Sequence, residues 1–436
     1  MNVVDILSNL VAFETVNNPA ENIKPNSEIL FYIKEEILEK LGYKTYLFEK
    51  NGYNSLIAYI TPRPGPKILF LGHCDVVPPG PNWNTNPFDF TIKEGYGYGR
   101  GTADMKGSVA VMLSIAKTLA NTDKGNVIFS FTLDEESGGV YGAGQLIKHL
   151  KRLNLLPDYV INGDANGLQI VTKRRNPYVI SLIIPKRVSK IKGKIGMKTF
   201  QTKIAGDRTM HAAYFMKDLD RHCATEASKF IKEKRFLVKS IRGTFVKNNV
   251  IPQEIDLEYI EPNDGTWETY DENLTKFLYA VEGLQELDFP SKPSDYGINL
   301  TFNYYREEKK HHFIQLDLRI MSKKTKTIKS ILQEYFKNNN VSGKIIVEGS
   351  IGPVMTPESS TLVVKALKVA ENMQLPSKVI EMGGATDSRW FSAKKIPTIE
   401  FGPLGKNVHG ANEAVEIKSL NIVEAFYLNI YTALVS

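Results

Sequence analysis

The chain of 436 residues contains only two cysteines, Cys74 and Cys223, which are too few for a disulfide framework and typical of a reducing compartment. It also lacks an uninterrupted apolar run of about 18 residues, so no membrane-spanning helix is expected. The N-terminus lacks a positively charged region followed by an apolar one, so we expect no secretory signal. These absences together predict a cytoplasmic protein with no membrane partner.

Acidic residues are missing from one long stretch, although the net charge of the whole chain is only +7. Between Asp164 and Asp207 the chain has no acid and these basic residues: Lys173, Arg174, Arg175, Lys186, Arg187, Lys190, Lys192, Lys194, Lys198 and Lys203. Such a stretch can bind nucleic acid, or it can be a solvated rim that attracts anionic substrates. Because aromatic residues are not interleaved as base-stacking platforms, we favour the second interpretation and expect no nucleic-acid partner.

Hydrophobic and charged contents of 42% and 24% are ordinary for a globular protein, and the length suggests two or three domains. Strand-like and helix-like segments alternate up to about residue 177 and again from about residue 356, which predicts a mostly parallel sheet covered by helices. Apolar periodicity predicts the helices of these two parts at 27–41, 105–119, 142–150, 359–373 and 417–434.

The middle of the chain has a different pattern, with alternating or β-branched segments and fewer helices. We expect strands at 178–184, 236–247, 255–260, 314–320 and 344–347, and helices at 224–234 and 327–336. The stretch 261–299 is rich in Pro, Gly, Asp and Asn and predicts a long loop-bearing insertion. The prediction is an α/β catalytic domain, residues 1–177 and 353–436, interrupted by an inserted α+β domain, residues 178–352.

Acidic or imidazole side chains follow three of the predicted core strands. They are His73 and Asp75 after the run 68–71, Asp134, Glu135 and Glu136 after 127–133, and Asp164 after 159–161. Charged groups at the end of a buried strand are costly to desolvate, so they need a function or good partners. Open α/β sheets bind ligands at the carboxyl ends of their strands.

The glycine-rich segment 95–101 does not match the dinucleotide-binding pattern G-x-G-x-x-G, because the sixth position is Arg100 or Thr102. We therefore expect no nicotinamide or flavin site. Asp104 follows, where the next helix should begin, and Asp is also a favoured residue for capping a helix.

Several carboxylates at one sheet edge repel one another unless cations hold them. Histidine, aspartate and glutamate without thiolate suit Zn²⁺, Mn²⁺ or Co²⁺. His409, in the loop after the predicted strand 398–401, adds a second imidazole. Asp75 stands two residues after His73, where it could orient the imidazole ring.

Six segments, in order along the chain, resemble the dinuclear zinc exopeptidase and deacylase family that includes succinyl-diaminopimelate desuccinylase, acetylornithine deacetylase, aminoacylase and carboxypeptidase G. The matching segments are 72–78, 99–107, 134–139, 163–165, 383–389 and 400–413. The resemblance implies a zinc-exopeptidase type catalytic domain with an inserted lid and dimerisation domain, and hence a homodimer.

The resemblance also implies the role of each site residue. His73 and Asp164 would bind one metal, Glu136 and His409 the second, and Asp104 would bridge them, while Glu135 would be the general base and Asp75 would orient His73. From the residues alone, Glu135 and Glu136 could exchange roles. The lid would supply His211 as an oxyanion donor, with His222 as competitor. Arg319, Thr386, Asp387 and Arg389 would contact the substrate.

The expected cofactors are two divalent ions per chain, zinc foremost, with cobalt and manganese as alternatives. The expected activity is hydrolysis of an amide bond in an N-acyl amino acid or small peptide with a free carboxylate. A metallocarboxypeptidase or dipeptidase activity is the alternative, because the motifs are compatible with both. A non-catalytic binding protein would have lost a ligand or the base, and the sequence retains them all.

Overall fold

The computed structural model describes residues 2–206 and 209–436. The chain divides into two compact units. Unit 1 comprises Met1–Lys173, Val354–Met382 and Thr386–Ser436, and unit 2 comprises Arg174–Pro353 and Gly383–Ala385. The short segment 383–385 is thus assigned to unit 2, although it lies far from the rest of that unit in the sequence.

Unit 1 is built on a nine-stranded sheet of order β1-β2-β6-β3-β7-β19-β8-β17, with β18 paired to β8. The four central strands β6, β3, β7 and β19 are parallel, and the pairs β1–β2, β2–β6 and β19–β8 are antiparallel. This is the mostly parallel sheet that the sequence predicts. The strands are β1 (Lys44–Lys50), β2 (Tyr53–Ile60), β3 (Lys67–His73), β6 (Asn126–Thr132), β7 (Tyr159–Asn162), β8 (Ile170–Arg174), β17 (Val354–Met355), β18 (Val379–Met382) and β19 (Thr398–Glu400).

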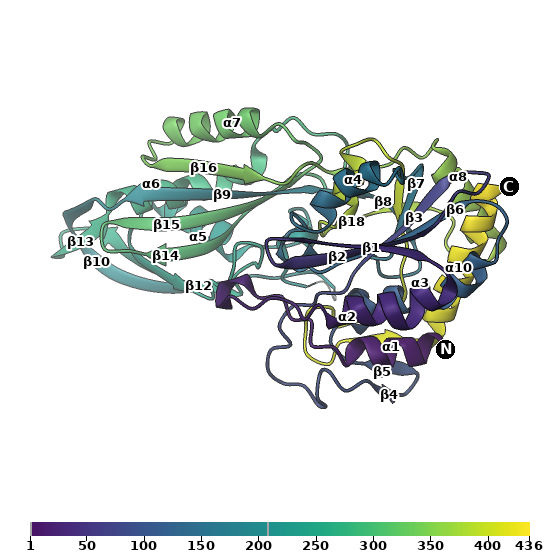
Figure 1. Ribbon diagram of the computed structural model, residues 1–436. Coiled ribbons are helices and arrows are strands. Elements are labelled where there is room, and N and C mark those ends of the chain that lie inside the picture. The colour runs from purple at the N-terminus through teal and green to yellow at the C-terminus, as the bar shows by residue number, and fades with distance from the viewer. Residues whose placement is uncertain (1, 207–208) are drawn as a thin grey trace. The chain divides into compact units, whose positions relative to one another are not determined.

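Helices cover both faces of this sheet (Figure 1). They do so because successive side chains of a strand point to opposite faces, and in the central strands the side chains on both faces are apolar. Phe70 of β3 packs in the core under α1, α3, α8 and α10, whereas Leu71 packs under α4 and α9. The helices are α1 (Val3–Val11), α2 (Glu28–Phe31) with its continuation η2 (Tyr32–Leu38) and η3 (Glu39–Leu41), α3 (Gly107–Ala120), α4 (Ala143–Arg152), α8 (Thr361–Asn372), α9 (Ser388–Ser392) and α10 (Ile417–Val435). They confirm the helices predicted for these two parts of the sequence.

A small four-stranded sheet of order β20-β21-β5-β4 also belongs to unit 1. Its strands are β4 (Thr91–Lys93), β5 (Tyr96–Tyr98), β20 (Gly405–Lys406) and β21 (Ala414–Glu416). Tyr98 pairs with Ala414, so the segment that follows β5 lies beside the segment that precedes β21. This register joins two loops that are more than 300 residues apart in the sequence.

Unit 2 contains two four-stranded antiparallel sheets, β11-β12-β10-β13 and β14-β15-β9-β16, which share one hydrophobic core with helices α5, α6 and α7. Its elements are β9 (Asn176–Pro185), β10 (Val188–Gln201), α5 (Cys223–Lys234), β11 (Leu237–Gly243), β12 (Glu254–Pro262), β13 (Thr266–Asp271), α6 (Glu272–Val281), β14 (Asn299–Glu307), β15 (His311–Ile320), α7 (Thr325–Asn338) and β16 (Lys344–Gly349). The unit is therefore α+β, as the sequence predicts.

The expected loop-bearing insertion at 261–299 also contains a strand and a helix that the sequence did not predict, β13 and α6. Asp271 caps α6 through a hydrogen bond from the N–H of Leu274, and Leu274, Phe277 and Leu278 pack into the core of unit 2. The overall composition of the stretch did not indicate this helix, because the Pro and Gly residues that favour loops lie before and after it rather than within it. Only the part after η7 (Glu282–Glu286) is an irregular connection to β14.

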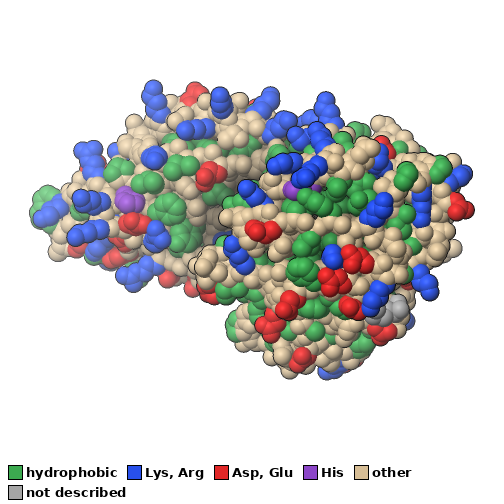
Figure 2. Space-filling model, in the orientation of Figure 1, with side chains coloured by type: hydrophobic (Ala, Val, Ile, Leu, Met, Phe, Trp, Pro, Cys, Tyr) green, Lys and Arg blue, Asp and Glu red, His purple; other side chains and the backbone are tan. Residues whose placement is uncertain are grey.

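The basic stretch between Asp164 and Asp207 contains the long strand β10, where lysines and apolar residues are exposed. Lys192 lies over the exposed ring of Trp267, and Lys198 lies over the partly buried ring of Phe230. Figure 2 shows Lys and Arg side chains scattered among other types on the visible face. Within the described ranges, no helix combines the length and the apolar character needed to cross a membrane.

Candidate metal centre

Loops at the carboxyl ends of the central strands of unit 1 bring together the side chains that the sequence singled out. His73 ends β3, Asp164 follows β7, and the turn η5 (Glu135–Ser137) follows β6. Asp104 lies between β5 and α3, and His409 lies between β20 and β21. Parallel strands must end at the same edge, so the sheet itself concentrates these groups.

Asp104 lies between the two imidazoles of this edge. Its Oδ1 is 3.0 Å from His73 Nε2, and its Oδ2 is 3.0 Å from His409 Nε2. Each oxygen of one carboxylate therefore faces a different histidine. This is the arrangement that a carboxylate shared by two metal ions requires.

Glu136 and Asp164 complete two groups of potential ligands around Asp104. His73, Asp104 and Asp164 form one group and Asp104, Glu136 and His409 the other, with the ligand atoms of each within 4.8 Å of one another. Glu136 Oε1 is 3.2 Å from His409 Nε2, at the distance of an ion pair, and this buried oxygen makes no hydrogen bond within the described residues. A buried carboxylate oxygen without a donor is chemically suited to a cation.

The electrostatics of the centre reflect its excess of acid. Burial alone would raise the pKa of Asp104, but hydrogen bonds from His409 and His73 hold it well below its usual value. Burial would lower the pKa of His73, but Asp104 and Asp75 raise it well above its ordinary value. The charge of Glu136 is the main cause that raises the pKa of His409 to about 12. The carboxylates thus attract positive charge, which divalent cations can supply while both rings stay neutral as ligands.

Asp75 has more contacts than the orientation of His73 requires. The Nδ1 atom of His73 lies 3.0 Å from the backbone carbonyl of Asp75 and 3.5 Å from its carboxylate. The Asp75 carboxylate accepts hydrogen bonds from the backbone N–H groups of Glu135 and Glu136 and from Asn17. The residue therefore orients His73 mainly through its backbone, and its side chain holds the turn that carries both glutamates.

Glu135 is partly buried beside the two ligand groups, on the same turn as Glu136. Burial and the charges of Asp164 and Asp387 raise the pKa of Glu135 well above its usual value. A carboxyl group of raised pKa can accept a proton and return it later in one catalytic cycle. The environment therefore suits Glu135 to acid–base chemistry and Glu136 to metal ligation.

The predicted substrate residues Thr386, Asp387 and Arg389 are buried in unit 1. The hydroxyl of Thr386 donates to Glu400, and Asp387 accepts from Thr132, while its Oδ1 has no hydrogen bond in the described part of the chain. Burial raises the pKa of Asp387 to about 6. Arg389 donates to the carbonyl of Gly138 at 2.6 Å, at the end of the glutamate turn. These contacts tie the three residues to the loops of the centre.

His211 lies in unit 2, just before the short helix η6 (Ala212–Tyr214), and its Nδ1 accepts the N–H of Ala213 at 3.0 Å. The proton of the neutral ring then resides on Nε2, which is 3.2 Å from the carboxamide nitrogen of Asn249. The carboxamide oxygen of Asn249 is buried and has no hydrogen bond in the described part of the chain. If the oxygen and nitrogen of the Asn249 carboxamide are exchanged, its oxygen accepts the hydrogen bond from His211 Nε2–H. This hydrogen bond would fix the orientation of the ring and the position of its proton on Nε2.

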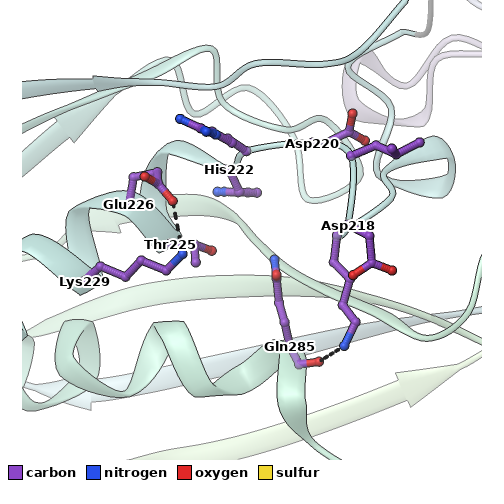
Figure 3. Close-up of a pocket in the computed structure, with 10 residues that line it drawn as sticks. Asp218, Asp220, His222, Thr225, Glu226, Lys229 and Gln285 are labelled. Carbon is purple, nitrogen blue, oxygen red and sulfur yellow. Dashed lines mark hydrogen bonds and ion pairs between the residues drawn. The ribbon is translucent and has the colours of Figure 1, made fainter.

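His222, the competing histidine, lines a polar cavity of about 500 Å³ in unit 2 (Figure 3). Its Nδ1 accepts from Ala224 N–H, its Nε2 lies 3.2 Å from Asn303 Oδ1, and burial lowers its pKa to about 4. Both nitrogens of this neutral ring thus have protein partners. The cavity has equal numbers of acidic and basic side chains, namely Asp218, Asp220, Glu226, Lys217, Arg221 and Lys229.

Arg319 is buried on β15, and its guanidinium group forms a two-pronged interaction with Asp317. Nε is 2.7 Å from Oδ1 of Asp317, and Nη2 is 2.9 Å from Oδ2. Because β15 lies between β14 and β9, this pair is inside a sheet rather than at its edge. A substrate carboxylate would have to share the guanidinium with Asp317.

Residues that the sequence did not single out also support the centre. Glu413 and Arg100 form a buried pair at 2.5 Å, and Asn17 donates to Asp75. Glu413 stands within a segment that resembles the zinc exopeptidases, but its partners are far away in the sequence. The resemblance of the segment 400–413 to this family was the sequence signal available for it.

Residues 69–433 match the model of Peptidase family M20/M25/M40, so the chain belongs to this family. The protein is therefore a metal-dependent hydrolase. It is 25% identical to a succinyl-diaminopimelate desuccinylase of Nautilia profundicola, over 97% of this chain and 96% of that protein. It is 26% identical to one of Helicobacter pylori, over 100% and 99%.

Solved structures support the fold. An aminoacylhistidine dipeptidase from Vibrio alginolyticus superposes with a TM-score of 0.73 at 13% identity, covering 99% of this chain and 96% of that one. An M20 family metallo-carboxypeptidase from Sulfolobus solfataricus gives a TM-score of 0.64 at 19% identity, covering 100% and 99%. At these identities the likeness shows the α/β fold with its second domain.

Proposed function

We propose that the protein uses two divalent metal ions to hydrolyse an amide bond in an N-acyl amino acid or a small peptide with a free carboxylate. The observation that carries the proposal is Asp104, whose two oxygens face His73 and His409 at 3.0 Å each. Its similarity to desuccinylases over nearly the whole chain favours a deacylase. The dipeptidase and carboxypeptidase folds keep a peptidase as the second candidate.

The ligand assignment follows the two groups of side chains. His73 and Asp164 would hold one ion, Glu136 and His409 the other, and Asp104 would bridge them. Imidazole and carboxylate ligands without thiolate suit zinc best, and also cobalt or manganese. The buried Glu136 oxygen without a hydrogen-bond donor supports this fit.

When bound, the metals supply a water molecule of lowered pKa and a Lewis acid for the scissile carbonyl. Glu135 accepts the proton of the attacking water and donates a proton to the departing amine, so the amide and water become a carboxylate and an amine. Asp75 holds the turn of Glu135 and Glu136 and keeps His73 oriented. Each of these roles rests on atoms within unit 1.

We assign two further roles to unit 2, which would be a lid and dimerisation domain. His211 would donate Nε2–H to the oxyanion in place of the Asn249 carboxamide, from the same chain or from the partner in a homodimer. Arg319 would be the carboxylate clamp, in competition with Asp317. In unit 1, Thr386, Asp387 and Arg389 would contact the substrate as residues of its pocket.

The variant Glu135→Gln tests the proposal. It keeps the size of the side chain and removes the proton acceptor, so kcat should fall by about 10² to 10⁴-fold while both metals stay bound. Kinetics combined with metal analysis measure the two quantities. Glu358→Gln, at an exposed acid of the same unit, should keep wild-type kinetics. Wild-type hydrolysis by pure Glu135→Gln would refute the assigned base.

A substrate panel separates the deacylase from the peptidase. The wild-type enzyme is compared on N-succinyl-, N-acetyl- and benzyloxycarbonyl-amino acids and on dipeptides. We expect the highest kcat/KM on an acyl amino acid. Preference for dipeptides would replace the deacylase by the peptidase. A pure protein that binds less than one metal per chain, even with added Zn²⁺ or Co²⁺, would instead be a binding protein.

A further inference from the structure

The buried pair of Arg100 and Glu413 lies beneath the metal centre and contacts no proposed ligand side chain. The small sheet of unit 1 brings the pair together, because Tyr98 at the end of β5 pairs with Ala414 at the start of β21. The N–H of Gly99 donates to the carbonyl of Glu413, which continues this pairing by one residue. Arg100 and Glu413 are therefore neighbours because of strand register.

The Glu413 carboxylate accepts four hydrogen bonds, three of which come from the backbone that leads into Asp104. Oε1 accepts from the N–H groups of Ala103 at 2.9 Å and Asp104 at 3.0 Å. Oε2 accepts from Gly101 N–H at 3.1 Å and from Arg100 Nη1 at 2.5 Å. One side chain thus holds the backbone of the residue that faces both histidines.

Arg100 extends these contacts to two further loops. Its Nη2 lies 3.3 Å from the carbonyl oxygen of Pro78 and 3.1 Å from that of Pro79, in the segment that follows His73. The same nitrogen is 3.4 Å from the carbonyl oxygen of His409. The guanidinium group also lies over the ring of Trp83. The three loops that carry His73, Asp104 and His409 therefore converge on one ion pair.

The backbone of the His409 loop needs such support. His409 has a φ of 62°, a left-handed conformation that is unfavourable for a residue other than glycine. Asn412, three residues later, donates to the carbonyl of Asn82 and accepts the N–H of Asn84. Two residues thus connect the His409 loop to the segment after His73. Asn412 does so at the surface, and Arg100 does so in the interior.

We propose that Arg100 and Glu413 are positioning residues that set the distance between the two groups of metal ligands by holding the backbone of Asp104 and His409. This inference rests on the proposed two-metal function. It assigns the pair a role in metal affinity and geometry, in addition to the stability that any buried ion pair influences. Partners that orient metal ligands typically change metal affinity by about 10 to 100-fold when they are replaced.

The variant Glu413→Gln tests the role of the carboxylate. Its amide nitrogen cannot accept a hydrogen bond, so it must face either the N–H groups of Ala103 and Asp104 or those of Gly101 and Arg100. We expect at least tenfold weaker binding of one Co²⁺ by the apoprotein and an altered visible absorption spectrum of the bound ion. The readout is a Co²⁺ titration, which does not depend on catalysis.

Arg100→Lys is the second variant, and it keeps the buried positive charge. A lysine cannot reach Glu413 and the carbonyl oxygens of Pro78, Pro79 and His409 with one fixed fork. We expect the same direction of change in the Co²⁺ titration, with a smaller loss of thermal stability than for Glu413→Gln. If Glu413→Gln does not fold, Arg100→Lys decides the question.

Asp271→Asn is the matched control, because Asp271 is also a buried carboxylate that accepts backbone N–H groups, those of Leu274 and Arg187 in unit 2. It should lower the melting temperature and leave the Co²⁺ affinities and spectrum unchanged. Wild-type affinities and spectra in folded Glu413→Gln and Arg100→Lys would overturn the inference. A spectral change in all three variants would also overturn it, since a general loss of stability would then be the cause.

Failure of the proposed function has a different signature. A wild-type protein that binds two Co²⁺ but hydrolyses no member of the substrate panel contradicts the proposed function and leaves the titration result in force. A wild-type protein that binds no Co²⁺ contradicts both. The titration and the substrate panel together therefore separate the two hypotheses.

Discussion

Histidine and aspartate cluster in both units, and the two clusters differ in their balance of acid and base. In unit 2, Asp271 Oδ2 lies 3.2 Å from His312 Nε2, and Tyr305 lies 2.9 Å from His312 Nδ1. Backbone N–H groups also satisfy both oxygens of Asp271. In unit 1, two imidazoles face the carboxylates of Asp104, Glu136 and Asp164, with Glu135 close by. The difference teaches that excess acid, rather than the presence of histidine, distinguishes a metal centre from a structural cluster.

Metal removal should cause the largest change, because it should abolish the activity that we assign to the cluster of unit 1. Dialysis of the wild-type protein against a chelator should abolish hydrolysis, because the metals would supply both the water of lowered pKa and the Lewis acid that the proposed reaction needs. Added Zn²⁺ or Co²⁺ should restore it. Calorimetry should also show a lower melting temperature without metal, since a ligand that binds the folded state stabilises it. Hydrolysis that survives complete chelation would contradict the two-metal proposal.

His211→Ala should have the next largest effect. Loss of one oxyanion donor typically lowers kcat by about 10² to 10³-fold. Metal content should be unchanged, because His211 belongs to unit 2 and the proposed ligands to unit 1. Steady-state kinetics measure the change, with His311→Ala as a control at a partly exposed histidine of unit 2. An unchanged kcat would remove His211 from the mechanism, and a strict monomer in light scattering would remove only its action from a partner chain.

Asp271→Ala should affect stability alone. The variant loses the cap of α6 and leaves His312 buried without its acid, for a combined cost of about 2–4 kcal/mol. Urea unfolding monitors the stability, and metal analysis should show no change. Asp288→Ala, at an exposed acid of the same unit, should be neutral. Loss of metal from Asp271→Ala would contradict the view that the cluster of unit 2 is structural and that only the cluster of unit 1 binds metal.

The smallest effect concerns the pH dependence of stability. The pKa of His222 is lowered to about 4 in the folded state, below its unfolded value of about 6.5. The unfolded state binds more protons between these values, so stability is complete above pH 6.5 and is lost as the pH falls toward 4. At pH 5 the loss should be about 2 kcal/mol.

Urea unfolding at pH 7 and pH 5 measures this loss. The variant His222→Asn keeps a side-chain oxygen for capping α5 and has no titrating group. Its stability should therefore change less between the two pH values, by the contribution of His222. An equal change in both proteins would show that His222 does not titrate as described.

Much of the fold was predictable because its signals are local. The helices at 107–120 and 417–435 follow apolar periodicity, and the parallel core follows the alternation of strands and helices. The helix within 261–299 was missed, because its cap at Asp271 stands among residues that also favour loops. For Arg319 the sequence is compatible with a salt bridge as well as with a substrate contact, and it does not show that the partner is Asp317.

The sequence by itself determined which side chains end the core strands and therefore which groups share one edge of the sheet. That conclusion needs only the alternation of strands and helices, because parallel strands must end together. The tertiary structure decided which atom each group contacts. It assigned the Asp75 carboxylate to the glutamate turn and Glu413 to the backbone of Asp104. Hydrogen bonds depend on positions within tenths of an ångström, which the packing of distant segments sets.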